Sequence, residues 1–466
     1  MNNIKILISD KARIVGLVVL VAGLSITIGL VISLGQSRWL SGLFLIPVIG
    51  VIAVAVFQQP YLGLVFVIAS LPVMDILPSI PFATSVVSLM GGVTLGVYIL
   101  RALGPGRHFS FKFPSQLIWG GLFIAWILFT NPSAALIPTS GRNWMFTFVQ
   151  LWILALLASQ LFDEPRKHKV LMWIYTLAAL VSAGFAIQKG GIGDTVADSI
   201  RSSGLVGGQN EAGRYFVVAL VFISYLRSTT KSKILSTLMM ISMGITVLGI
   251  FATVSRTGLL LLLTTVGLLL ILQVNRRKSF QVGIVLVLVV LIVALIFADN
   301  IFTIMRTILP SIQQGADTMG IRYNLWTAGW HMWLDHPVQG VGIGQYPVNL
   351  PYYGRDLLDL QYLKLGAHNM YVQLLAETGI VGLFLFLGLI GSVVRNLWIA
   401  TRSQDSNLAS LAKVWLIVLI LMLLGGITKQ DQFDKLVWIC FGMGISQLYK
   451  FGKPLLQNIQ SDHKAF

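Results

Sequence analysis

Charged residues are scarce in this sequence: only 11% of its 466 residues are Asp, Glu, Lys or Arg, whereas 56% are hydrophobic. Soluble domains carry about 25% charged residues, so the composition excludes an ordinary water-soluble domain. Cysteine is rarer still, because Cys440 is the single one and no intrachain disulfide can form. No cluster of Cys, His, Asp or Glu has metal-ligand spacing, so we expect neither a metal site nor a cofactor.

Long apolar runs take up most of the chain. Many reach the roughly 18-residue length of a membrane-spanning helix, which predicts an all-α, polytopic membrane protein with about 12–14 transmembrane helices. The run at 14–34 is expected to be an uncleaved first span. The run at 61–78 contains Pro72, Asp75 and Pro78, so it is either a continuous helix or a broken, re-entrant one. The expected spans are 14–34, 39–57, 61–78, 84–103, 115–130, 144–161, 170–188, 214–227, 233–252, 257–273, 280–298, 379–400, 411–428 and 434–450.

Basic residues are distributed unequally between the two sides of the membrane. With the N-terminus placed in the cytoplasm, cytoplasmic segments hold 21 of the 33 basic residues but only five of the 17 acidic ones. Short loops rich in Lys and Arg orient membrane proteins in this way. Topology therefore explains the net charge of +16, nucleic acid is not an expected partner, and both termini are expected in the cytoplasm.

The stretch 250-IFATVSRTGLL-260 places Arg256 between two apolar runs, in a turn that this topology assigns to the outer face. An arginine at the bilayer centre costs about 2.5–3.5 kcal/mol, so Arg256 belongs at a membrane surface. One interpretation is an arginine whose charge reaches the lipid headgroups. The other is an anion site at the N-terminus of the next helix, where free N–H groups and the helix dipole favour negative charge.

Two outer segments, 189–213 and 299–378, are too long to be simple turns. Arg201 lies in the first, and Arg214 follows it. In the second, 321–337 is predicted to form a helix ended by Pro337. One face of this helix is expected to carry a cation and three aromatic rings, at Arg322, Trp326, Trp330 and Trp333. Such a face is typical of a helix in the membrane interface, and packing within the loop explains it equally well.

A tight turn is predicted at 338-VQGVGIGQY-346, since its glycines lack dinucleotide-binding spacing. His368 then stands at the start of a helix that Asn369 is expected to cap. His368 is either a hydrogen-bonded structural residue or a catalytic one, and Glu377 either orients it or lies on the polar face of the helix. The outer arginines together are able to neutralise a polyanion such as a pyrophosphate; they are Arg201, Arg214, Arg256 and Arg322.

Three motifs in order, SRTGLL, RYNLWTAGWHMWLDHPVQGVGIGQY and HNMYVQLLAETGIVG, resemble the O-antigen ligase and O-antigen polymerase superfamily, over a core at 255–382. The resemblance implies a GT-C-like architecture with a cavity opening outward, and metal-independent transfer of a glycan from undecaprenyl pyrophosphate. By the same resemblance Arg256 and Arg201 hold the pyrophosphate, with Arg214 competing for the role of Arg201. Arg322 matches the arginine that opens the loop helix, and His368 lies beside the acceptor.

The expected organisation has three parts: an N-terminal transmembrane bundle at 1–298, a periplasmic loop with an interfacial helix at 299–378, and C-terminal transmembrane helices at 379–466. His368 is the expected general base, which Glu377 orients. Direct attack by the acceptor would invert the anomeric centre.

The expected location is the bacterial inner membrane, with the active site on the periplasmic face. The expected partners are membrane lipid, a glycan donor linked to undecaprenyl pyrophosphate, and an acceptor glycan. The acceptor is lipid A–core for a ligase, which we favour slightly, or another lipid-linked repeat for a polymerase. A transporter or flippase for an anionic solute is the alternative of another class; the absence of a visible internal repeat argues against it.

Overall fold

The computed structural model describes residues 54–77, 86–103, 113–130, 140–189, 202–272 and 318–451, and every regular element in these ranges is helical. The α-helices are α3 (Tyr61–Ala69), α4 (Val86–Leu103), α5 (Leu117–Thr130), α7 (Ser140–Leu161), α8 (Pro165–Lys189), α9 (Gln209–Thr229), α10 (Lys233–Ala252), α11 (Arg256–Leu272), α14 (Thr318–Asp335), α15 (Tyr346–Tyr353), α16 (Met370–Ala400), α17 (Ser406–Gly425) and α18 (Lys435–Phe451). Three short 3-10 helices are η1 (Leu71–Ile76), η2 (Leu360–Tyr362) and η3 (Asp431–Phe433).

Many of these helices are apolar enough to lie in a membrane. The five that are long enough to cross it are Asn143–Leu161, Pro165–Lys189, Lys233–Ala252, Met370–Ala400 and Ser406–Gly425. Shorter apolar helices include α4, α5, α11 and part of α18. The chain is therefore an all-α, polytopic membrane protein, as its composition predicts. The expected spans at 14–34 and 280–298, and most of 39–57, lie outside the described residues.

The third expected span is broken. α3 ends at Ala69, and the 3-10 helix η1 follows with Pro72 in its first turn. Proline lacks the N–H group that would continue the helical ladder. After the break, Asp75 N donates a hydrogen bond to Leu205 O at 3.1 Å. The prolines and the aspartate of this run thus mark an interruption of the helix, and the chain there turns toward the segment before α9.

α9 is the central helix of the bundle. Every residue from Ala212 to Leu226 is buried, because α8, α10, α11 and α17 pack around it. A helix that is covered on all sides is apolar around its whole circumference. Arg214 is the exception within this buried stretch, so its charge must be balanced inside the protein.

α16 is bent at Gly379, where φ is +66°. At the bend, backbone carbonyl groups lose their N–H partners within the helix, so they accept hydrogen bonds from other segments. Val341 N donates to Ala376 O at 2.9 Å, and Gly342 N donates to Glu377 O at 3.0 Å. The predicted tight turn at 338–346 is confirmed, and it packs against the bend. The helix begins at Met370, nine residues before the expected span at 379–400.

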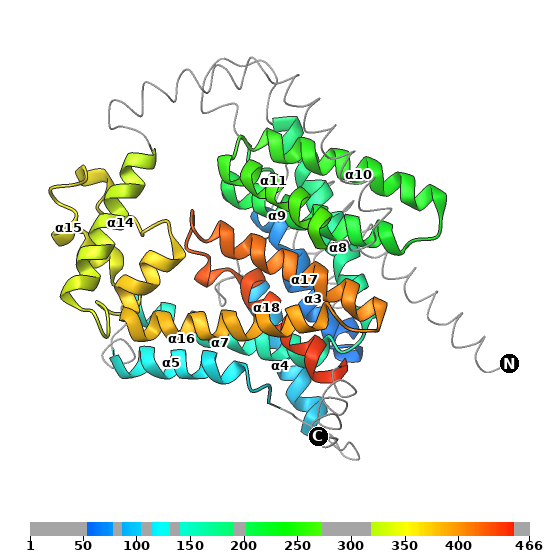
Figure 1. Ribbon diagram of the computed structural model, residues 1–466, viewed down its shortest axis with the longest axis horizontal. Coiled ribbons are helices and arrows are strands. Elements are labelled where there is room, and N and C mark those ends of the chain that lie inside the picture. Colours follow the sequence, from blue (N-terminus) through cyan, green and yellow to red (C-terminus); the bar gives the residue numbers. More distant parts are fainter. Residues whose placement is uncertain are drawn as a thin grey trace, which may run out of the picture.

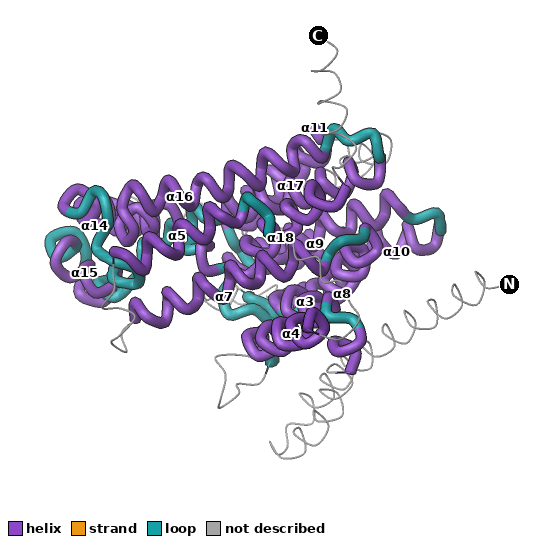
Figure 2. Tube along the Cα trace, turned by 90° about the horizontal axis from the view of Figure 1, so that it is seen from below, coloured by secondary structure: helices purple, strands orange, loops and turns teal. Residues whose placement is uncertain are grey.

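The outer segment has a small hydrophobic core of its own. α14 and α15 lie together at one end of the helix bundle, and α16 extends from them along it (Figures 1 and 2). This second core is separate from the large core of the membrane helices and consists of Leu325, Ala328, Met332, Tyr346, Leu350, Leu358, Leu363, Ala367 and Ala376. It holds α14 over the start of α16.

Candidate functional site

The start of α11 presents Arg256 at the protein surface. Ser255 is buried and caps the helix, since its Oγ accepts a hydrogen bond from Gly258 N at 3.0 Å. The same hydroxyl donates to Asn210 Oδ1 at 2.7 Å. Arg256 is the first residue of the helix and is exposed. The prediction that Arg256 stands at a helix N-terminus is confirmed.

Two glycines bring the starts of α9 and α11 together. A Cβ atom at Gly213 would lie 3.2 Å from Cα of Gly258, and one at Gly258 would lie 3.3 Å from Cα of Gly213. Larger residues would force the two helices apart. Arg214, next to Gly213, and Arg256 therefore belong to the same end of the bundle.

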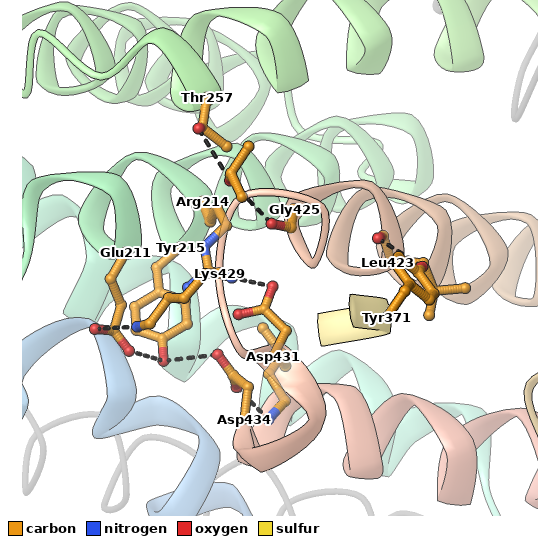
Figure 3. A network of polar contacts seen from close by, with 12 residues as sticks. Glu211, Arg214, Tyr215, Thr257, Tyr371, Leu423, Gly425, Lys429, Asp431 and Asp434 are labelled. Atoms are coloured by element: carbon orange, nitrogen blue, oxygen red, sulfur yellow. Dashed lines mark hydrogen bonds and ion pairs between the residues drawn. The ribbon is translucent and has the colours of Figure 1, made fainter. Parts of the chain in front are cut away.

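The linker between α17 and α18, residues 426–434, crosses this end of the bundle (Figure 3). The Thr257 hydroxyl donates to the Thr428 hydroxyl at 3.1 Å. Lys429 Nζ lies 2.7 Å from Glu211 Oε2. Through these two contacts the α17–α18 linker joins the start of α11 to the start of α9.

Arg214 is buried beneath this linker, and its charge is balanced there. Its Nη1 forms an ion pair with Asp431 Oδ2, and the two side chains are 1% and 0% exposed. Beside the pair, the Tyr215 hydroxyl lies 3.2 Å from Glu211 Oε1 and 3.3 Å from Asp434 Oδ2 (Figure 3). Arg214 was predicted to contact a pyrophosphate. In the structure its guanidinium is covered by protein and paired with a carboxylate. Its observed contact attaches the linker to α9.

His368 lies in the turn that leads into α16. Its φ is +48°, a conformation that side chains other than glycine seldom adopt. Asn369 then caps α16: its Oδ1 accepts hydrogen bonds from two backbone N–H groups of the first turn, at 2.9 and 3.1 Å. This cap was predicted and is confirmed. On the other side, Trp326 Nε1 donates to Ala367 O at 3.0 Å, so α14 and the cap together define the position of the turn.

Burial lowers the pKa of His368, and the positive charges of Arg322 and Lys429 lower it further. The neutral imidazole is therefore favoured at neutral pH, and this is the form that accepts a proton. Hydrogen bonds place α14 and the α17–α18 linker next to the His368 turn: Trp326 of α14 donates to Ala367 O at 3.0 Å, and Met370 N donates to Gly426 O of the linker at 2.7 Å. Thr428 of that linker contacts Thr257, which directly follows Arg256. His368 and Arg256 therefore belong to the same end of the bundle.

Glu377 is buried in the second turn of α16, and it organises the neighbouring backbone. Its Oε1 accepts hydrogen bonds from Tyr346 N at 3.1 Å and from Gln373 Nε2 at 3.2 Å, and Gly344 N also donates to the carboxylate. Gln373 Oε1 in turn accepts from Ala367 N at 3.2 Å. Glu377 therefore reaches the His368 turn through Gln373.

The tryptophans of α14 differ in burial. Trp326 packs within the protein against the His368 turn, whereas Trp330 is 50% exposed. The Trp330 and Trp333 rings lie 4.6 Å apart between centroids. α14 ends at Asp335, two residues before Pro337, which confirms the predicted end of this helix.

Arg201 lies outside the described residues, directly before Ser202. Within the parts of the chain that the structure describes, no three or more His, Cys, Asp or Glu side chains are grouped so that they could hold a metal ion.

Sequence reasoning did not single out the polar residues of the linker. The signal was present at 429-KQDQFDK-435, where four charged residues fall within seven positions between two apolar helices. In the fold, these residues contact α9, which is distant in sequence: Lys429 pairs with Glu211, Asp431 pairs with Arg214, and Asp434 lies beside the Tyr215 hydroxyl (Figure 3). Their partners become evident only when the helices are packed.

Comparison with known families places these residues in context. Residues 238–387 match the family model described as O-antigen ligase. The match includes Arg256, Arg322, His368 and Glu377, and it ends before the α17–α18 linker. A comparison with curated proteins finds no match. The matched region carries the motifs on which the resemblance rests, and over these residues the chain is similar to the O-antigen ligase family.

Proposed function

We propose that the chain transfers a glycan from undecaprenyl pyrophosphate to an acceptor sugar at the periplasmic face of the bacterial inner membrane. The observation that carries the proposal is the shared position of Arg256 and His368, which the α17–α18 linker connects. An exposed cation at a helix N-terminus is suited to hold a departing diphosphate. A neutral imidazole at the same end is suited to accept a proton.

His368 is the general base of this proposal. The acceptor hydroxyl attacks the anomeric carbon, its proton passes to the His368 imidazole, and the bond from the anomeric carbon to the diphosphate oxygen breaks. Attack from the face opposite the leaving group inverts the anomeric centre. Arg322 and Lys429 favour the neutral base before the reaction, and a positioned base contributes about 10²- to 10⁴-fold to the rate.

Arg256 and Arg322 are the proposed diphosphate ligands among the described residues. Negative charge increases on the diphosphate as the bond breaks, so fixed guanidinium groups stabilise the transition state more than the ground state. Arg201 retains the ligand role that the resemblance implies. Arg214 acts instead through Asp431, by holding the linker in place, and no metal ion takes part.

Glu377 is a positioning residue in this proposal. Its hydrogen bonds to the 344–346 backbone and to Gln373 stabilise the turn that carries His368. A carboxylate in this place defines the orientation of the base without contacting the substrate.

We favour slightly a ligase that uses lipid A–core as the acceptor; the family match supports the ligase and polymerase group as a whole. A polymerase would instead use another lipid-linked repeat. Lipopolysaccharide from a deletion strain distinguishes the two: accumulated lipid-linked polymer indicates a missing ligase, and products with a single repeat indicate a missing polymerase.

The decisive experiment is glycan transfer by the purified protein in lipid nanodiscs, from an undecaprenyl pyrophosphate glycan to each candidate acceptor. We expect wild-type turnover, and a kcat about 10²- to 10⁴-fold lower for His368→Ala. His331→Ala is the matched control, because His331 is an exposed histidine on α14. Wild-type rates from His368→Ala would refute the general-base role, and no transfer by the wild type to any acceptor would refute the function.

A further inference from the structure

The α17–α18 linker places one lysine in a position that the family motifs do not account for. The Lys429 side chain is 33% exposed, and its ammonium lies 2.7 Å from Glu211 Oε2, whose side chain is 16% exposed. Partly exposed ion pairs of this kind contribute little to stability. Lys429 is therefore able to exchange its carboxylate partner for a stronger anion without a large loss of folding free energy.

The backbone that carries Lys429 is held firmly. Asp431, two residues later, forms the buried ion pair with Arg214. At the other end of the linker, Gly426 O accepts a hydrogen bond from Met370 N at 2.7 Å. Breaking a buried ion pair is costly, so the linker backbone has a defined position, and Lys429 would change partners by moving its side chain.

The same linker also contacts the residue next to Arg256 and lies against the turn that carries His368. Thr428 contacts Thr257, next to Arg256. The amide of Gln430 lies against the turn before α16, and with its oxygen directed toward that turn it accepts a hydrogen bond from His368 N at 3.2 Å. Lys429 lies between these two contacts in the sequence of the linker, so it projects from a backbone that joins the anion-binding end of α11 to the proposed base.

We propose that Lys429 binds the anionic headgroup of the donor, an organic diphosphate, together with Arg256, and that it exchanges Glu211 for a phosphate oxygen when the donor binds. This assignment rests on the proposed function and adds a donor-binding residue to it. Glu211 keeps a partner after the exchange, because the Tyr215 hydroxyl lies 3.2 Å from its other oxygen. A lysine binds phosphate as a compact point charge.

The test measures binding of undecaprenyl pyrophosphate itself, with no acceptor present, to the full-length protein in nanodiscs. We expect Lys429→Gln to raise the Kd about tenfold or more, the effect of losing one charge-assisted hydrogen bond. Lys429→Arg keeps the charge and restores most of the affinity. Lys364→Gln is the matched control, since Lys364 is an exposed lysine of the outer segment, and its Kd equals that of the wild type.

Glu211→Gln separates donor binding from a purely structural ion pair. If Lys429 served only to hold Glu211, removing either partner would weaken binding equally. If Lys429 binds the diphosphate, Glu211→Gln binds it as tightly as the wild type or more tightly, because the competing carboxylate is neutral. Thermal unfolding shows whether Lys429→Gln folds. If it does not, Glu211→Gln decides alone. Tenfold weaker binding of undecaprenyl pyrophosphate by Glu211→Gln overturns the proposal, and equal or tighter binding supports it.

The outcomes also separate this assignment from the proposed function. Wild-type protein that binds undecaprenyl pyrophosphate but transfers no glycan contradicts the function and leaves the Lys429 comparison intact. Wild-type transfer together with an unchanged Kd for Lys429→Gln overturns the role of Lys429 alone. No binding by the wild type overturns both.

Discussion

Two neighbouring helices carry an arginine near the same end of the bundle, and the two arginines have different environments. Arg214 lies in the second turn of α9, is 1% exposed and is paired with Asp431. Arg256 is the first residue of α11 and is exposed. α9 is surrounded by other helices, so any charge on it must be neutralised within the protein. Among the described residues α11 packs mainly against α9 and α17, and Arg256 at its start is exposed.

The comparison shows that the position of a helix in the bundle determines what an arginine can do. In the linear sequence both residues are cations at the start of an apolar run. In the folded protein Arg214 is paired with Asp431 and holds the α17–α18 linker, whereas Arg256 is exposed at the start of α11. Four substitutions test this distinction, in decreasing order of expected effect.

The largest effect is expected from Asp431→Ala. The substitution leaves the Arg214 charge buried and unpaired, which should lower the free energy of unfolding by about 3–5 kcal/mol. Chemical denaturation in detergent, with thermal unfolding, measures the loss. The double variant Asp431→Ala/Arg214→Met removes both charges and should recover much of the stability. Wild-type stability of the single variant would show that Arg214 has no structural role.

Arg256→Ala should have the opposite pattern. An exposed cation at a helix N-terminus gains nothing from the helix dipole, so stability should change by no more than about 0.5 kcal/mol. The Kd for undecaprenyl pyrophosphate should rise about tenfold, through the loss of a charge-assisted contact. Arg402→Ala, at an exposed arginine between α16 and α17, is the control. A large loss of stability with unchanged binding would reverse the distinction between the two arginines.

The pH dependence of kcat/KM tests the environment of His368. Because burial, Arg322 and Lys429 lower its pKa from the ordinary value of 6.5, activity should be constant near neutral pH and fall only on acidification below that value. Arg322→Gln removes one cation, so the imidazolium becomes less unfavourable and the acidic limb should move to higher pH. An unchanged or oppositely shifted limb would contradict the electrostatic contact between α14 and the His368 turn.

The smallest effect is expected from Asp434→Asn. Burial first, and then the neighbouring Asp431, raise the pKa of Asp434 to about 6 from 3.8. The protonated form is favoured in the folded protein, so this group contributes stability below about pH 4 that is lost as the pH rises through about 6. Asp434→Asn should remove that pH dependence. Since Asp434 is partly exposed, the difference should be about 1 kcal/mol or less, and denaturation at several pH values measures it.

Local features of the fold could be predicted from the sequence because they depend on residues close together in the chain. Asn369 caps α16 through its own side chain and the next two N–H groups. α14 ends before Pro337, which lacks a donor. Pro72 breaks the helix of the third span. Each of these is a short-range effect of backbone hydrogen bonding.

The arrangement of the site required long-range contacts that no local pattern contains. Arg214 and Asp431 are more than 200 positions apart and form a pair, and hydropathy alone does not show that α9 is the central helix. Lys429 was counted only as one of several outer cations. Glu377 was expected beside His368, whereas its hydrogen bonds reach the His368 turn through Gln373.

By itself the sequence determined a helical membrane protein, because apolar length acts through the bilayer. The side of the membrane that carries the excess charge and the outer position of the arginines stay predictions from the basic loops. The tertiary structure decided which arginine is enclosed and which is accessible. The reason is physical: the free energy of a charge depends on the groups packed around it, and those groups come from distant parts of the chain.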